Sequence, residues 1–77
     1  RHRQVLIGFR RIEAARAAVQ LATRNVAEQE ARLGLGLATA RQVLDAQDDL
    51  GSARVSLQQA IVDYDRARIL WEQLVGE

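Results

Sequence analysis

Three aspartates in the second half of the sequence come nearest to a reactive site. Asp45, Asp48 and Asp49 are spaced at i, i+3 and i+4, so a helix would place their carboxylates on one face. Clustered carboxylates can serve acid–base chemistry or bind a hard cation. Because no base, nucleophile or glycine-rich phosphate loop accompanies them, we expect no enzymatic activity. Such acids also occur on solvated faces near helix N-termini, where each contributes about 0.3–1 kcal/mol.

The composition excludes several other kinds of site. The 77 residues contain no Cys and a single His, His2, which leaves no ligand set for zinc or an iron–sulfur centre and no disulfide framework. All 11 basic residues are arginine, and they are balanced by 10 acids for a net charge of +1. A protein held on nucleic acid by phosphate contacts needs a clear basic excess. We therefore expect no metal, no cofactor and no nucleic-acid partner.

The elements that would carry these residues are two long helices. No proline interrupts the chain, and its abundant Ala, Leu, Arg, Gln and Glu favour helix. Gly34 and Gly36 mark a central turn, and Thr39 with Gln42 fits a capping box at the start of the next helix. The sequence predicts a single helical hairpin with one helix over about residues 3–33, a turn over 34–38 and a second helix over about 40–74. A link this short makes the two helices antiparallel.

A sustained seven-residue repeat predicts that the helices form a coiled coil. One set of core positions is Val5, Ile12, Val19, Val26 and Leu33 in the first helix, and Val43, Leu50, Leu57, Tyr64 and Trp71 in the second. Three positions later come small residues for the most part, namely Gly8, Ala15, Ala22, Gln29, Ala46, Ala53, Ala60, Ala67 and finally Leu74. This spacing is typical of left-handed supercoiling. Large residues beside alanine let the two helices approach closely.

Further apolar residues lie off this seam. They are Ile7, Ala14, Ala18 and Leu21 in the first helix, and Leu44, Val55, Ile61, Val62 and Leu70 in the second. A two-helix hairpin has one buried seam per helix, so these residues would face water unless other helices cover them. The fold class is therefore all-α, a long hairpin that packs into a helical bundle or an α-barrel wall by oligomerisation. We expect the segment to be a piece of a longer chain.

The turn and the start of the second helix resemble a known family. Residues 36–50 read G-L-A-T-A-R-Q-V-L-D-A-Q-D-D-L, which is similar to the G-L-A-T-x-x-x-V-L-D-A-Q-x-x-L segment of the outer-membrane efflux proteins, the TolC-like channels. Arg32 before the turn, Ala53, Asp63 with Tyr64, and the closing Leu74-Val75-Gly76 agree with the family. The resemblance extends over about residues 12–76, and its turn motif is the specific part.

The resemblance implies a passive transport role. TolC-like channels are homotrimers of the Gram-negative outer membrane, and this segment looks like the C-terminal helical hairpin of their periplasmic tunnel. It implies that the turn docks on a periplasmic adaptor (membrane fusion) protein, which links the channel to an inner-membrane pump. The membrane strands of the family are absent from the segment. Gly34 is an extra glycine, and Leu33 stands where an aromatic residue is common.

The candidate site residues follow from this implied role. Those of the docking turn are Arg32, Gly34, Leu35, Gly36, Leu37, Ala38 and Thr39. The two glycines could simply end a helix, or they could also expose Leu35 and Leu37 for docking. Asp45 matches the tapered channel entrance, where threefold symmetry would turn one carboxylate into a ring that selects cations.

Two other classes of protein remain as alternatives. One is a small helical-hairpin module that self-associates into a four-helix bundle and regulates a partner. The other is an all-helical enzyme of the chorismate mutase kind, whose site would need Arg and Glu converging inside the core. The core register here is almost purely apolar, which disfavours the enzyme.

Overall fold

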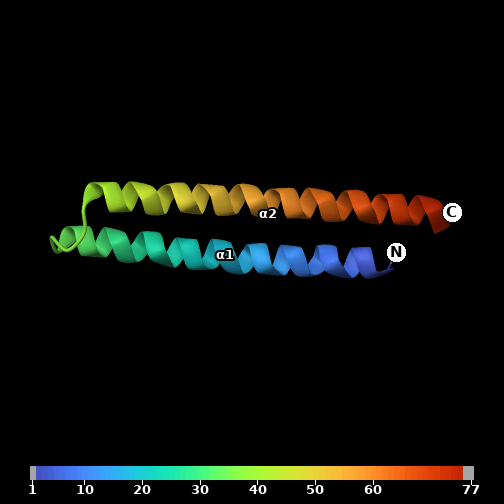
Figure 1. The fold of residues 1–77 in the computed structure, drawn as a ribbon, viewed down its shortest axis with the longest axis horizontal. Coiled ribbons are helices and arrows are strands. Elements are labelled where there is room, and N and C mark those ends of the chain that lie inside the picture. The colour runs from blue at the N-terminus through green and yellow to red at the C-terminus, as the bar shows by residue number, and fades with distance from the viewer. Residues whose placement is uncertain (1, 76–77) are drawn as a thin grey trace.

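The chain folds into a long antiparallel hairpin of two helices (Figure 1). The computed structural model describes the backbone of residues 2–75 and the side chains of residues 7–74. Helix α1 spans His2–Gly34 and helix α2 spans Ala40–Val75. The described part contains no strand, so the predicted all-α hairpin is confirmed. It measures 61 × 14 × 12 Å, which is a rod two helices wide.

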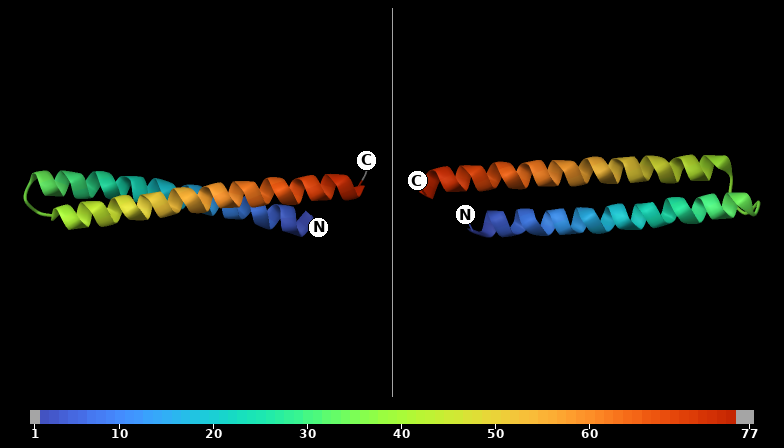
Figure 2. Two further views of the ribbon diagram at one scale, coloured as in Figure 1. Left: turned by 90° about the horizontal axis from the view of Figure 1, so that it is seen from above. Right: turned by 180° about the vertical axis from the view of Figure 1, so that it is seen from behind.

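The seven-residue repeat forms the contact between the helices. The residues that are buried or half-buried in α1 include Gly8, Ile12, Ala15, Val19, Ala22, Val26 and Gln29. Those in α2 are Val43, Ala46, Leu50, Ala53, Leu57, Ala60, Tyr64, Ala67 and Trp71. All of these positions belong to the predicted seam. Of the other seam positions, Leu33 and Leu74 are exposed, and the side chain of Val5 lies outside the described residues. The two helices cross as they run side by side (Figure 2), as heptad packing requires.

Most levels of the seam pair a large residue with a small one. At Gly8, an added Cβ would lie 3.1 Å from Cδ1 of Tyr64 and 3.9 Å from its Cα, so the tyrosine ring occupies the space that Gly8 leaves. For two residues that face each other across the seam, the two sequence numbers therefore add up to about 72 along the rod. This register sets Ile12 level with Ala60, both of them buried. Small partners allow the two backbones to approach closely.

Both ends of the predicted seam are more open than the repeat suggests. Leu33 is 41% exposed and Leu74 is 63% exposed, although the heptad assigns both to the core. Leu33 comes level with the turn, where α2 has not yet begun. The position facing Leu74 would precede residue 1. A leucine at a core position stays exposed where the opposite helix offers no surface to cover it.

The apolar residues off the seam are exposed in the single chain. In α1, Ile7 is 50% exposed and Leu21 is 69% exposed. The corresponding residues of α2 are also exposed, namely Leu44, Val55, Ile61, Val62, Ile69 and Leu70. No polar or charged side chain is buried among the described residues. Over the same residues, neither helix has the combination of length and apolar character needed to cross a membrane.

A matched pair of glycines tests the close packing of the seam. Gly51 lies inside α2 with nothing within 4 Å of an added Cβ, whereas Gly8 faces the ring of Tyr64. Gly51→Ala should stabilise the hairpin by about 1 kcal/mol, because alanine favours helix. Gly8→Ala should gain less or lose stability, because the tyrosine ring must move. Thermal unfolding of both variants at one protein concentration measures the difference. Equal stabilisation by the two substitutions would contradict the tight contact at Gly8.

Candidate functional site

The turn begins with a well-defined helix termination in α1. The Gly36 N–H donates to the Leu33 carbonyl at 3.0 Å, and the Leu37 N–H donates to the Arg32 carbonyl at 2.7 Å. These two bonds form a Schellman motif, in which the residue at C′ adopts a left-handed conformation. That residue is Gly36, with φ of 76°. Gly34 is the last residue of α1, so only one of the two central glycines is required by backbone conformation.

The turn ends with the predicted capping box of α2. The Thr39 N–H donates to Oε1 of Gln42 at 2.8 Å, and the Gln42 N–H donates to Oγ1 of Thr39 at 3.2 Å. The two residues thus satisfy each other's backbone donors at the start of the helix. Ala38, just before the cap, is half-buried, whereas Thr39 itself is exposed.

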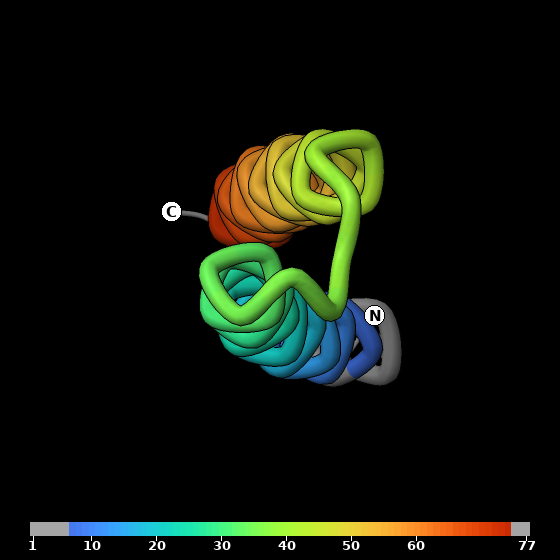
Figure 3. Tube along the Cα trace, turned by 90° about the vertical axis from the view of Figure 1, so that its left-hand side faces the viewer, coloured from blue at the N-terminus to red at the C-terminus, as the bar shows by residue number. Residues whose placement is uncertain are grey.

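Between these two caps the chain presents leucine side chains to solvent. Leu35 is 75% exposed and Leu37 is 68% exposed, and both lie in the short crossing between the helices at one end of the rod (Figure 3). Leu35 and Leu37, with Gly36 between them, thus leave apolar surface uncovered at the turn. We call Arg32 together with residues 34–39 the tip. Arg32 is exposed and lies in the last turn of α1.

Asp45 lies on α2 beyond the tip. Its Oδ1 is 3.8 Å from Nε of Arg41, one helical turn closer to the tip, and the two side chains are 66% and 85% exposed. An ion pair as exposed as this contributes little to stability. The carboxylate of Asp45 therefore remains exposed to solvent. Asp48 and Asp49 are also exposed, and no group of three or more acidic, His or Cys residues that could hold a metal occurs in the described part of the chain.

One ion pair joins the two helices. Nη2 of Arg11 in α1 lies 3.7 Å from Oδ2 of Asp63 in α2. The spacing of Arg11 and Asp63 in the sequence does not predict this pair. The register of the two helices does, because both residues flank the contact between Gly8 and Tyr64. By contrast, Arg24, Glu28 and Arg32 follow at i, i+4 spacing without forming an ion pair, over the part of the chain described.

Comparisons with known proteins identify no relative of this chain. No protein-family model matches the sequence, and no curated protein or solved structure does so either. The functional assignment therefore depends on the turn motif and on the geometry of the hairpin.

A second glycine pair tests the geometry of the tip. Gly36→Ala should destabilise the hairpin by about 1–2 kcal/mol, because a left-handed conformation is costly for alanine. Gly34→Ala is the control, since Gly34 is helical and an added Cβ meets nothing within 4 Å. It should leave stability unchanged or raise it. Urea unfolding monitored by circular dichroism gives both values. If Gly34→Ala proved the more harmful, the turn would have a different termination.

Proposed function

We propose that this hairpin is a periplasmic tunnel and adaptor-docking segment of a trimeric, TolC-like outer-membrane efflux or secretion channel. In this role it performs no covalent chemistry and acts as a passive conduit for solutes that an inner-membrane pump expels. Its tip meets the periplasmic adaptor protein, and its helices form part of the tunnel wall. The channel opens by a shift of coiled-coil hairpins at the tip.

The tip carries this proposal. The sequence that resembles the family's turn motif begins at Gly36, the residue that adopts the left-handed conformation. The exposed Leu35 and Leu37 sit at the end of a 61 Å rod, which suits end-on contact with a partner. Because the turn is held by backbone hydrogen bonds at the end of α1 and by the capping box at the start of α2, the side chains of these leucines take no part in closing the hairpin.

The sides of the rod support the role of a wall segment. Each helix has exposed apolar residues away from the seam, including Leu21 in α1 and Val55 in α2. A wall of side-by-side helices requires each helix to contact a neighbour on both sides. A free-standing hairpin has no such requirement.

A small self-associating interaction module is the second candidate. The same exposed apolar sides favour it, because a four-helix bundle of two hairpins would also cover them. The full-length reading frame separates the two candidates. A channel protein would contain outer-membrane strands and a second related hairpin, whereas a short cytosolic protein would exclude the channel.

The docking role of the tip can be tested in the full-length channel. Leu37→Asp should abolish efflux and leave the trimer intact, because a carboxylate replaces an apolar contact outside the hairpin core. Drug susceptibility measures efflux, and cross-linking measures trimer assembly. Leu37 is a better target than Gly36, where an aspartate would also strain the turn. Gln47→Asp, at an exposed position on the side of α2, is the control and should keep efflux. Unchanged drug resistance in Leu37→Asp would contradict docking at the tip.

The proposed role of Asp45 can be tested separately. Three copies of its carboxylate around a narrow entrance would attract cations. Asp45→Asn should therefore lower cation selectivity and weaken block by multivalent cations in planar-bilayer recordings. Asp65→Asn, an exposed acid much farther along α2, is a control for the loss of one charge. Identical currents in the wild type and Asp45→Asn would exclude the ring.

A further inference from the structure

The two edges of the seam differ in charge. On one edge, Arg11 and Asp63 form the ion pair between the helices, and each comes one position before a large residue of the seam. Their sequence numbers add up to 74, slightly more than for residues that face each other within the seam. On the other edge, the flanking positions come one after a small residue of the seam, so by the same offset facing numbers add up to about 70. This places Arg16 of α1 opposite Arg54 of α2.

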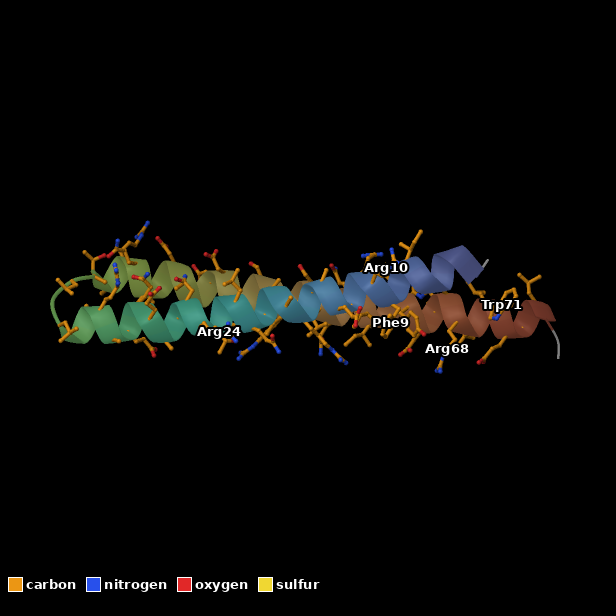
Figure 4. All side chains as sticks on the ribbon, turned by 90° about the horizontal axis from the view of Figure 1, so that it is seen from below. Phe9, Arg10, Arg24, Arg68 and Trp71 are labelled. Atoms are coloured by element: carbon orange, nitrogen blue, oxygen red, sulfur yellow. The ribbon has the colours of Figure 1, made fainter. Side chains whose placement is uncertain are left out.

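The edge with the two arginines becomes apolar one heptad farther from the tip. Phe9 comes seven residues before Arg16, and Ile61 comes seven residues after Arg54, so the register places them opposite each other. Phe9 is 48% exposed and Ile61 is 36% exposed. Figure 4 shows Phe9 of α1 and Arg68 of α2 along one edge of the rod, and Arg68 lies two heptads from Arg54. We call Phe9, Arg16, Arg54 and Ile61 the arginine edge.

Neither arginine of the arginine edge has an acidic partner within the described residues. Both side chains are exposed, and the ion pairs of this part of the chain involve other residues. Glu13 lies three residues before Arg16 without pairing to it, and the positions three and four residues from Arg54 hold no acid. Coiled coils usually place opposite charges at such flanking positions, so two facing cations weaken the hairpin. Departures of this kind from the rules of folding are expected where a protein binds a ligand.

We propose that the arginine edge binds an amphiphilic anion, which is a phosphate or carboxylate head joined to an apolar body. A guanidinium group offers a planar fork of N–H donors that fits such a head. The guanidinium groups of Arg16 and Arg54, one from each helix, hold one head between them, and its charge removes their repulsion. The apolar body lies against Phe9 and Ile61. This inference goes beyond the proposed channel role and does not depend on it.

The surface beside Arg54 has room for the apolar body. Arg54, Val55, Leu57 and Gln58 line a shallow depression of about 310 Å³. Leu57 is a half-buried residue of the seam, so the depression reaches toward the contact between the helices. Ile61 follows Leu57 and Gln58 on the next helical turn. The depression therefore leads from the charged part of the arginine edge to its apolar part.

Titration of the 77-residue chain with 2-naphthyl phosphate tests the charged part of the site. The polarisation of the naphthalene fluorescence rises on binding and gives the Kd. Arg16→Gln and Arg54→Gln should each weaken binding by about tenfold, because a charge-assisted contact is lost. Arg10 lies away from this edge (Figure 4), so Arg10→Gln is the matched control and should change the Kd by less than about twofold. Equal effects of Arg10→Gln and Arg16→Gln would overturn the proposed site.

Comparison with inorganic phosphate tests the apolar part. The chain should bind 2-naphthyl phosphate at least about tenfold more tightly than inorganic phosphate, since only the former buries apolar surface. Phe9→Ala should weaken binding of 2-naphthyl phosphate by about threefold or more and leave the affinity for inorganic phosphate unchanged. Equal affinity of the wild-type chain for the two anions would overturn the amphiphilic character of the ligand.

Thermal unfolding of the free chain separates binding from folding. Arg54→Gln should unfold at a slightly higher temperature than the wild type, and Arg54→Glu at a higher temperature still. The reason is that repulsion from Arg16 is replaced first by a neutral side chain and then by an ion pair. Arg54→Glu should also abolish binding of 2-naphthyl phosphate. A lower unfolding temperature for both variants would show that Arg54 serves the fold, and would overturn the inference.

Vesicles distinguish the two sources of such an anion, a soluble compound and a lipid headgroup. Vesicles of phosphatidylcholine with phosphatidic acid present a phosphate head on a membrane. Sedimentation of the chain with these vesicles, if lost in Arg16→Gln and kept in Arg10→Gln, would support the site and assign it to a lipid. Binding of 2-naphthyl phosphate alone would assign it to a soluble compound, and binding of neither would overturn the inference. Either result leaves the Leu37→Asp experiment at the tip unaffected, and failure of that experiment would remove only the channel role.

Discussion

The structure depends on one interaction, the pairing of a large with a small side chain at most levels of the seam. It brings the two helices close enough for Tyr64 to lie over Gly8, and it fixes the register of the whole rod. Few of the described residues are buried, because the rod is two helices wide, and the buried ones lie in two places, Ile12 with Ala60 and Val43 with Ala46. Most of the molecule is surface, so its function must reside in its sides and its tip.

The tip and the sides are separate surfaces with different requirements. At the tip, the chain is closed by the backbone hydrogen bonds of the Schellman motif at Gly36 and by the capping box, in which the side chains of Thr39 and Gln42 accept from backbone N–H groups. Along the sides, apolar residues such as Leu21 in α1 and Val55 in α2 are exposed. The proposed channel role uses both surfaces, since a tunnel segment needs neighbours along its length and a partner at its end.

The sequence was informative wherever structure arises from local or periodic patterns. The heptads predicted which faces of α1 and α2 meet, and the spacing of Thr39 and Gln42 predicted the cap. The sequence did not reveal which central glycine has a positive φ, because either Gly34 or Gly36 could end the helix. The i, i+4 spacing of Arg24, Glu28 and Arg32 is likewise not followed by ion pairs in the described part of the chain, since solvated side chains have many rotamers of similar energy. The repeat also assigns Leu74 to the core, whereas this residue is 63% exposed because the position that would face it lies outside the described residues.

The way in which the turn is closed separates folding from recognition at the tip. The chain reverses through main-chain groups, one glycine and a Thr–Gln pair, while the side chains of Leu35 and Leu37 make no contribution to that reversal. Substitutions of Leu35 and Leu37 should therefore change the stability of the hairpin little. In the proposed docking role, changes in these two side chains would alter the surface offered to the partner and leave the supporting rod as it is.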